Sequence, residues 1–412
     1  MRRICLTEWE KKTEVKLTVE ERDQIKKALP KAVIEPEPGK ENIFQINPQD
    51  YVGIIRTTDL VVEIKPKLPI DRVLFLVTYA ENPEYWREQQ IVQFKNAPNL
   101  QEAIAIPFIY FVEKAFKRGQ LFGYKEVDES LHQVKGKVRF SDQIKRYQRV
   151  TLPIEVTYDE LTVDIEENRH ILAAASKLLQ LSRLSEKIKS SLRRIIRQLE
   201  FSEVTHYHYD HRSIKPIQIS RLNQHYERPL ALAKLILSNE TIELYGESTQ
   251  STGLLFNMAK VFEEFVRVAL RESLNLSEKE FPEKTKNLYL DNNKKVQVHP
   301  DLSWWRQGEC VLVGDVKYKE TNPTGKRPDL YQLLSFAVAA NVDKAFLIYA
   351  AGEVDNLRYQ IREIEKELIV ETLELGGDPA SILAEVEAIA RKFRKSCSHQ
   401  SSSLEAAHLL GI

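Results

Sequence analysis

The chain has 412 residues, and its 60 basic and 60 acidic side chains give a formal charge of zero. Hydrophobic residues make up 42% and charged residues 29%, a balance that excludes both a disordered polyelectrolyte and a protein embedded in a membrane. The length predicts two or three domains. Because the charges cancel, any surface that binds nucleic acid must be local.

The cysteine pattern indicates a reducing compartment. Cys5, Cys310 and Cys397 are the only cysteines, and no CxxC pair occurs, which excludes a disulfide framework and a cysteine-based zinc site. The amino terminus becomes charged after a few residues, unlike a signal peptide, and no stretch approaches about 18 consecutive apolar residues. We therefore expect a soluble, cytoplasmic protein with no membrane segment.

Residues 1–150 are predicted to form a strand-rich N-terminal domain. Runs of β-branched residues within 51–67 predict a hairpin. The segment 30–39 is rich in Pro and Glu and predicts an exposed loop. Apolar residues at helical spacing predict a helix over 99–118, with Pro107 in its first turn.

Residues 151–245 are predicted to form a helical connecting region, with helices over 168–181 and 184–199. The second helix is strongly basic. Such a helix can follow a phosphate backbone, but a run of this kind is usually a solvated outer face, which is the interpretation we favour. The His-rich segment His206–His211 matches no common zinc spacing and predicts a polar surface loop.

The last third is predicted to be a mixed α/β domain over residues 246–395, followed by a flexible tail over 396–412. An unbroken apolar stripe predicts an amphipathic helix over 256–273. The pattern then predicts, in chain order, strands at 287–290, 295–302 and 310–318, a helix at 328–340 and a strand at 344–351. The whole chain is thus predicted to be a multidomain protein of the α+β or α/β class.

One cluster of residues carries recognisable chemistry. Asp301 ends one predicted strand, and Asp315 and Lys317 lie on the next, where strand alternation puts both side chains on one face. If the two strands pair, Asp301 approaches Asp315, and two converging carboxylates suit Mg²⁺. A metal held there would activate water and stabilise charge on a scissile phosphate. With Lys317 to position that water or neutralise the oxyanion, the cluster predicts phosphodiester hydrolysis without a covalent intermediate.

A simpler interpretation is that an Asp-x-Lys on a strand is only an ion pair at a sheet edge. Three features bring a metal site level with the ion pair, so that both interpretations stay open at this point. The apolar run Val311–Gly314 leads into the charged pair, Pro300-Asp301 lies at hairpin distance, and the preceding helix offers Glu263 and Glu264 as a third carboxylate. Both glutamates lie at the margin of the apolar stripe, so helical phase does not choose between them.

These motifs resemble the PD-(D/E)xK nuclease superfamily, with Pro300-Asp301 as its first element and Asp315-Val-Lys317 as its second. The following helix contains Gln332-Leu-Leu-Ser-Phe336, which is similar to the QxxxY element of RecB-like members. Phe336 stands where tyrosine is usual and removes a hydroxyl, whereas Gln332 keeps its polar group.

An ordered set of patches narrows the resemblance to the McrC family, the nuclease subunit of McrBC-type modification-dependent restriction systems. In chain order, the patches are residues 51–55, 63–68, 158–169, 221–226, 235–237 and 255–266. In the last patch the family pattern places a glutamate directly after Phe, which favours Glu263 over Glu264 as the third metal ligand.

The resemblance implies a Mg²⁺-dependent DNA endonuclease that docks through its N-terminal part on a hexameric AAA+ GTPase, McrB. It further implies that the chain stimulates GTP hydrolysis and cuts double-stranded DNA that carries modified cytosine. The chain has no G-x-x-x-x-G-K-[ST] loop, so GTP would be bound by the partner. Two alternatives stay open: a non-catalytic docking and GTPase-activating subunit built on a nuclease-like scaffold, and a stand-alone RecB-like nuclease.

Overall fold

A computed structural model describes residues 2–56, 59–81, 83, 98–147, 152–181, 183–207, 209, 217–238, 252–285, 287–321, 327–352 and 357–410. Over these ranges the chain is a mixed α/β protein with four sheets, as predicted for the fold class. It divides into two compact units, one made of residues 1–97 and 242–412 and the other of residues 98–241. Each unit is described by itself.

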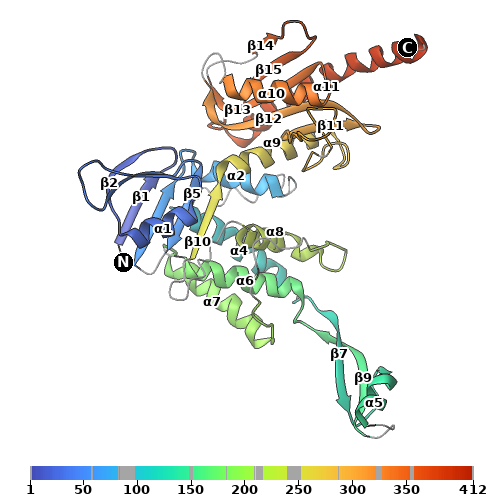
Figure 1. The fold of residues 1–412 in the computed structure, drawn as a ribbon. Helices are drawn as coiled ribbons and strands as arrows, with labels where there is room; N and C mark the ends of the chain where they lie inside the picture. Colours follow the sequence, from blue (N-terminus) through green and yellow to red (C-terminus); the bar gives the residue numbers. More distant parts are fainter. Residues whose placement is uncertain are drawn as a thin grey trace. The chain divides into compact units, whose positions relative to one another are not determined.

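The first unit begins with a four-stranded sheet in the order β1-β6-β5-β10 and a three-stranded sheet in the order β2-β4-β3 (Figure 1). The elements are β1 (Arg2–Thr7), β2 (Lys12–Lys16), α1 (Val19–Ala28), β3 (Val33–Pro36), β4 (Ile43–Asn47), β5 (Tyr51–Arg56), β6 (Leu60–Lys65), α2 (Ile70–Glu81) and β10 (Thr252–Asn257).

The predicted hairpin is confirmed, because β5 and β6 pair antiparallel. The prediction of a loop over 30–39 is wrong in part, since Val33–Pro36 forms β3 and pairs with β4. Helix α1 begins at a capping box: Glu21 N donates to Thr18 Oγ1 at 3.1 Å, and Thr18 N donates to the Glu21 carboxylate at 2.8 Å.

The C-terminal part of the first unit contains a five-stranded mixed sheet in the order β11-β12-β13-β15-β14. Its elements are α9 (Met258–Leu274), β11 (Leu302–Arg306), β12 (Glu309–Thr321), α10 (Arg327–Ala339), β13 (Lys344–Gly352), β14 (Leu357–Gln360), β15 (Glu367–Thr372) and α11 (Pro379–Leu410). β13 is parallel to both β12 and β15, whereas β11 and β14 run antiparallel to their neighbours.

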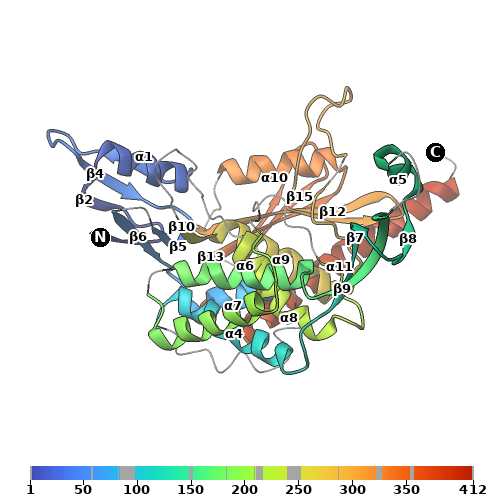
Figure 2. The same ribbon diagram turned by 90° about the horizontal axis from the view of Figure 1, so that it is seen from below.

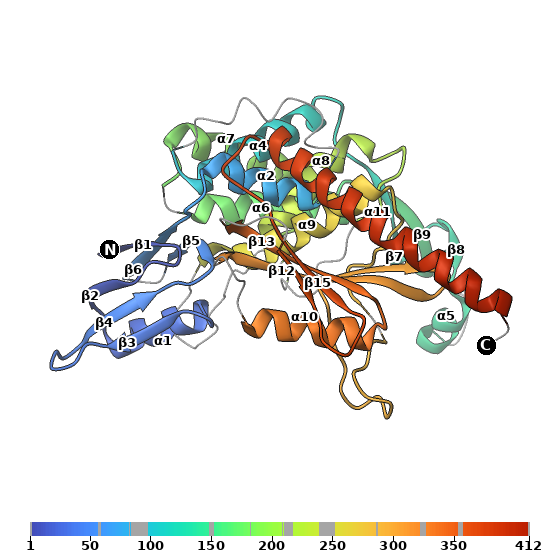
Figure 3. The ribbon, with the colours of Figure 1, turned by 90° about the horizontal axis from the view of Figure 1, so that it is seen from above.

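The two faces of this sheet are covered by different helices. Val313 and Leu347 pack with Leu333 and Phe336 of α10 in one core cluster. On the other face, the Tyr318 ring contacts Phe262 of α9, and the rings of Phe346 and Phe393 of α11 also meet. Figure 3 shows α10 on one side of the sheet and α9 and α11 on the other. Alternate residues of β12 therefore face α10, and Asp315 and Lys317 belong to that set.

Helix α9 connects the N-terminal sheet to the C-terminal one. β10 pairs with β5 and leads directly into α9, whose first N–H, at Met258, donates to the Asp50 carbonyl at 2.8 Å. The Phe265 ring packs edge-on against Phe75 and Tyr79 of α2, with ring centroids 5.3 and 5.4 Å apart. Burial of aromatic side chains of this size stabilises a fold by roughly 2 to 3 kcal/mol each. The helix that carries Glu263 is thus held at its first residue and near its middle.

The second unit combines a helical core with a long hairpin (Figure 1). Its elements are α4 (Leu100–Phe116), β7 (Gly123–Leu131), β8 (Lys137–Val138), α5 (Phe140–Tyr147), β9 (Ile154–Thr162), α6 (Glu166–Gln180), α7 (Glu186–Phe201), a 3-10 turn (Gln224–Tyr226) and α8 (Glu227–Ser238). Helix α6 packs against α7 and α8, and α4 packs against both of those helices (Figure 2). β7 and β9 extend from this core and carry β8 and α5 at their far end.

The predicted helices of the second unit are confirmed, with one correction. Pro107 lies in the middle of α4 and not in its first turn, because Asn99 caps the helix earlier by accepting from Glu102 N at 2.9 Å. The basic helix α7 buries its apolar stripe, and its Lys189 forms an ion pair with Glu186 at 2.8 Å, as expected of a solvated face.

The remaining sequence predictions have separate outcomes. His206 Nε2 lies 2.8 Å from Glu200 Oε1, while His208, Asp210 and His211 fall outside the described residues. No helix within the described ranges is long and apolar enough to cross a membrane. The three cysteines are free thiols.

Candidate active site

The candidate site is built where one strand of the C-terminal sheet stops. β11 and β12 pair antiparallel, and the last pair is Leu302 with Gly314. The prediction of a strand over 295–302 is wrong, because the strand that pairs with β12 begins at Leu302. Asp301 therefore lies just before β11. Asp315 directly follows Gly314, the last residue of β12 that pairs with β11. The edge of β12 is open at this point.

Asp301 occupies this open edge. Its Oδ2 accepts a hydrogen bond from the backbone N–H of Val316 at 2.9 Å, which satisfies a strand N–H that β11 no longer reaches. The Asp301 carboxyl also makes a hydrogen bond with the Asp315 carboxyl. The structure thus brings together the two aspartates that the sequence singled out.

The two carboxyl groups lie together in a buried position, which disfavours their ionisation. Asp315 is 1% exposed, and its burial, followed by the charge of Asp301, raises the pKa of Asp315 to about 8. Burial also raises the pKa of Asp301 above its ordinary value. Carboxylates at hydrogen-bonding distance hold a shared proton unless a cation replaces it.

Lys317 completes the cluster. Its Nζ lies 2.5 Å from Asp315 Oδ2, and its side chain is 24% exposed. Burial opposes the ammonium charge, but the carboxylates of Asp315 and Asp301 outweigh that effect and raise the pKa of Lys317 above its ordinary value. Lys317 is therefore a cation that connects the buried carboxyl pair to solvent.

The two glutamates of α9 differ in their surroundings. Glu263 is half-buried and Glu264 is exposed. Burial, followed by the charge of Glu264, raises the pKa of Glu263, and Asp315 adds to this effect. Glu263 is thus close enough to the cluster to interact with it electrostatically. Within the described part of the chain, however, no three His, Cys, Asp or Glu side chains are close enough together to hold a metal ion.

The chemistry of the donor set nevertheless fits a divalent cation. Asp301 and Asp315 place carboxylate oxygens against each other in a buried position, which is the arrangement that hard cations bind. Burial, followed by the charge of Asp301, raises the pKa of Asp315, and Lys317 does not offset these two effects. A divalent ion would replace the shared proton, and Glu263 is a further carboxylate that acts electrostatically on Asp301.

The QxxxY-like element of α10 is not joined to this cluster by a hydrogen bond between described side chains. Gln332 is exposed, and its carbonyl accepts from Ser335 Oγ at 2.6 Å. Phe336 is buried in the core cluster that α10 forms with the sheet, so the apolar ring in place of tyrosine serves packing.

Two residues near Lys317 were missed by the sequence reasoning. Tyr349 of β13 is the register neighbour of Lys317, and its hydroxyl donates to Asp329 Oδ2 of α10 at 2.7 Å. Asp329 also acts electrostatically on Lys317. The position of Asp329, two helical turns before Phe336 and on the same buried side, was the available signal.

Most of the chain matches one known protein family. The model of the McrBC 5-methylcytosine restriction system component family matches residues 46–350. The chain belongs to this family.

One solved structure agrees with the fold of this McrBC-family chain. A tetradecameric assembly of Thermococcus gammatolerans McrB AAA+ hexamers with bound McrC contains a similar chain, with a TM-score of 0.57 and 18% identity over 95% of this chain and 100% of that one. A cryo-EM structure of the Thermococcus gammatolerans McrBC complex matches with a TM-score of 0.43 and 21% identity, covering 66% of this chain and 88% of that one. No curated protein matches significantly.

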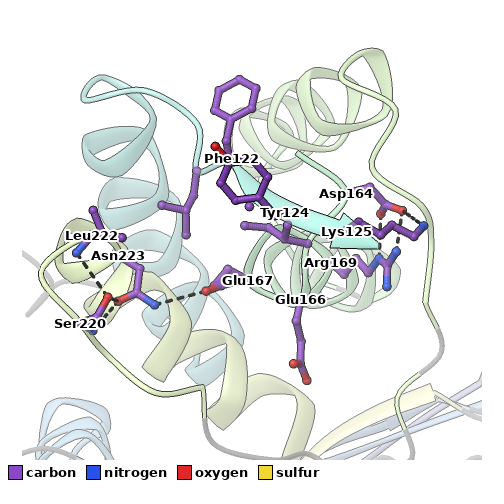
Figure 4. Close-up of a pocket in the computed structure, with 13 residues that line it drawn as sticks. Phe122, Tyr124, Lys125, Asp164, Glu166, Glu167, Arg169, Ser220, Leu222 and Asn223 are labelled. Carbon is purple, nitrogen blue, oxygen red and sulfur yellow. Dashed lines mark hydrogen bonds and ion pairs between the residues drawn. The ribbon is translucent and has the colours of Figure 1, made fainter. Parts of the chain in front are cut away.

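The McrBC-family chain also has a cavity of about 470 Å³ in its second unit (Figure 4). Several of its polar groups are paired with one another: Arg169 Nε donates to Asp164 at 2.7 Å, and Asn223 Nδ2 donates to Glu167 at 3.2 Å. The hydrogen bond from Arg169 is the main cause that holds the pKa of Asp164 well below its ordinary value. We assign this cavity to the packing at the root of the hairpin.

Proposed function

We propose that the chain is the Mg²⁺-dependent DNA endonuclease subunit of a GTP-driven restriction complex that acts on DNA with modified cytosine. The observation that carries this proposal is the cluster of Asp301, Asp315 and Lys317 at the open edge of β12. Family membership supports the restriction role, because the matching family is named for 5-methylcytosine restriction.

Each residue of the cluster has a defined task in this proposal. Asp301 and Asp315 would hold the cation, which when bound supplies an activated water and neutralises charge on the scissile phosphate. The Val316 N–H fixes the Asp301 carboxylate. Lys317 lies at the solvent side of the pair, where its ammonium group can orient the attacking water or stabilise the developing oxyanion. Gln332 is an exposed polar group on α10, and we assign it a contact with substrate only through its resemblance to the QxxxY element.

The proposed partner is a hexameric AAA+ GTPase. The chain has no P-loop of its own, and the similar chain of known structure comes from an assembly of McrB AAA+ hexamers with bound McrC. We propose that residues 1–150 dock on this partner, and that the nuclease domain, residues 246–395, acts on double-stranded DNA in the cytoplasm once the complex has formed.

The test is cleavage of cytosine-methylated DNA by the full chain mixed with its GTPase partner, GTP and Mg²⁺. Asp315→Asn and Lys317→Ala are expected to reduce cleavage by on the order of 100-fold or more. The same variants should stimulate the GTPase as the wild type does. Asp159→Asn, an exposed change in the hairpin of the second unit, controls for a change of acidic charge.

The results separate the alternatives. Wild-type chain that stimulates the GTPase but never cuts DNA would be a docking and activating subunit on a nuclease-like scaffold. Cutting by the isolated chain with Mg²⁺ and no nucleotide would identify a stand-alone nuclease. Full cleavage by both variants would show that the site is wrongly assigned.

A further inference from the structure

A short hairpin precedes the candidate site and is rigidly joined to it. We call residues 288–298 the basic hairpin. Leu290 N donates to the Val296 carbonyl at 2.8 Å, and Val298 N donates to the Leu288 carbonyl at 3.0 Å. Leu288 and Val298 are buried in the core cluster of α10 and the sheet. The base of the basic hairpin is therefore part of the folded core.

A buried polar network fixes the segments that flank the basic hairpin. Thr285 Oγ1 donates to the Pro300 carbonyl at 3.1 Å and lies 2.7 Å from Ser303 Oγ. Ser303 Oγ also accepts from the Trp305 indole N–H at 2.9 Å. Since Pro300 directly precedes Asp301, the position of the hairpin is fixed relative to the candidate metal ligands.

The tip of the basic hairpin is held by one aspartate. The Asp291 carboxylate accepts from the backbone N–H groups of Asn293, Lys295 and Val296 at 3.1, 2.8 and 2.7 Å. These hydrogen bonds, that of Val296 first, lower the pKa of Asp291. Lys294 has a φ of 56°, which turns the chain at the tip. The negative charge of Asp291 is thus directed toward the backbone of the hairpin.

The outward charge of the tip is positive. Lys294 and Lys295 are exposed, and neither ammonium group has a hydrogen-bond or ion-pair partner among the residues that the structure describes. Asn292 and Asn293 are exposed beside them. Figure 3 shows the basic hairpin extending beyond α10 on the face of the sheet that α10 covers, which is also the face of Asp315 and Lys317.

We propose that Lys294 and Lys295 contact the phosphodiester backbone of DNA beside the scissile phosphate. This inference rests on the proposed function. Lysines neutralise phosphates without reading sequence, and such contacts fix the position of a protein along the duplex. Because the base of the basic hairpin is part of the folded core, the hairpin would hold the DNA backbone at a fixed distance from Asp301.

The test measures the affinity of the full chain for a short DNA duplex over a range of KCl concentrations. The double variant Lys294→Gln, Lys295→Gln is compared with Arg362→Gln, Arg391→Gln. The control pair removes the same charge from exposed positions, one in the turn between β14 and β15 and one on α11. The slope of log affinity against log salt should fall by about 1.8 in the hairpin variant, which is roughly 0.9 for each lost phosphate contact, and should not change in the control.

A second arm uses the complex with the GTPase partner. The hairpin variant should need more DNA for half-maximal cleavage, keep its rate at saturating DNA, and stimulate the GTPase normally. Equal salt slopes for the hairpin and control variants would overturn the inference even if DNA is cut. Absence of cleavage by the wild-type complex, together with a reduced slope, would overturn the proposed function and leave the DNA contact in place.

Discussion

The Asp301 carboxylate accepts a hydrogen bond from the backbone N–H of Val316 at 2.9 Å. This bond exists because β11 begins only at Leu302, opposite Gly314, so that the next residues of β12 have no strand partner on that side. Asp301 thus completes the sheet edge and at the same time lies against Asp315. One side chain therefore has both a structural and a proposed chemical role.

The two roles of Asp301 are separable by substitution. Asn at this position keeps an oxygen that accepts from Val316 N, so Asp301→Asn should change the free energy of unfolding by less than about 1 kcal/mol. The lost charge should still reduce DNA cleavage by on the order of 100-fold. Denaturant unfolding and cleavage rates check this. A variant that cuts normally would remove Asp301 from the proposed chemistry.

The two glutamates of α9 provide a matched pair. Glu263 is half-buried and interacts electrostatically with Asp315, whereas Glu264 is exposed. Glu263→Gln should weaken cleavage by about 10-fold or more, as loss of a metal-site group does, and Glu264→Gln should leave it unchanged. The apparent Mg²⁺ requirement of the reaction is the measurement. The reverse order of effects would place Glu264 at the site.

A buried glutamate of the N-terminal domain predicts a pH dependence of stability. Glu8 is 0% exposed. Burial is the main cause that raises its pKa to about 7, against hydrogen bonds from Lys67 N and the Tyr318 hydroxyl. The folded chain thus favours the neutral acid, and the stability gained below pH 4.5 is lost as the pH rises towards 7.

The free energy of unfolding should fall by on the order of 3 kcal/mol as Glu8 ionises. Glu8→Gln stays neutral and keeps an acceptor for Lys67 N, so it should be more stable than the wild type at pH 8 and similar to it at pH 5. Thermal unfolding midpoints at the two pH values test this. The same decline from pH 5 to pH 8 in both proteins would contradict the assignment to Glu8.

Gly53 lies where β5 pairs closely with β10. Its φ is +128°, and a Cβ at this position would lie 2.0 Å from the Leu254 carbonyl oxygen. Gly53→Ala should therefore destabilise the chain by about 2 to 3 kcal/mol. Gly39, with a φ of +74° and no atom within 4 Å of such a Cβ, is the control, and Gly39→Ala should cost about 1 kcal/mol. Equal losses in unfolding free energy would show that the clash is relieved.

The sequence predicted what depends on local pattern. Alternation along one strand was sufficient to place Asp315 and Lys317 on one face, and apolar spacing was sufficient for the helix of Glu263. The start of β11 was predicted too early in the chain. Lys295 and Val296 donate their N–H groups to the Asp291 carboxylate, so these residues do not form the strand that the composition predicted.

Other features depend on residues far apart in the chain. The pairing of β10 with β5 cannot be predicted from either segment, because each has only the pattern of a short apolar strand. The hydrogen bond between Tyr349 and Asp329 can be predicted only when the placement of α10 on the sheet is known. The capping box at Thr18 and Glu21, by contrast, was a readable start signal for α1.

The central claim is that Asp301 and Asp315 hold a divalent cation. Titration of the full chain with Mn²⁺, a paramagnetic substitute for Mg²⁺, followed by electron paramagnetic resonance, measures the bound ion directly. The account predicts a site in the wild type and in Glu264→Gln that is lost in Asp315→Asn. Binding of the same amount of Mn²⁺, with the same affinity, by Asp315→Asn would contradict it.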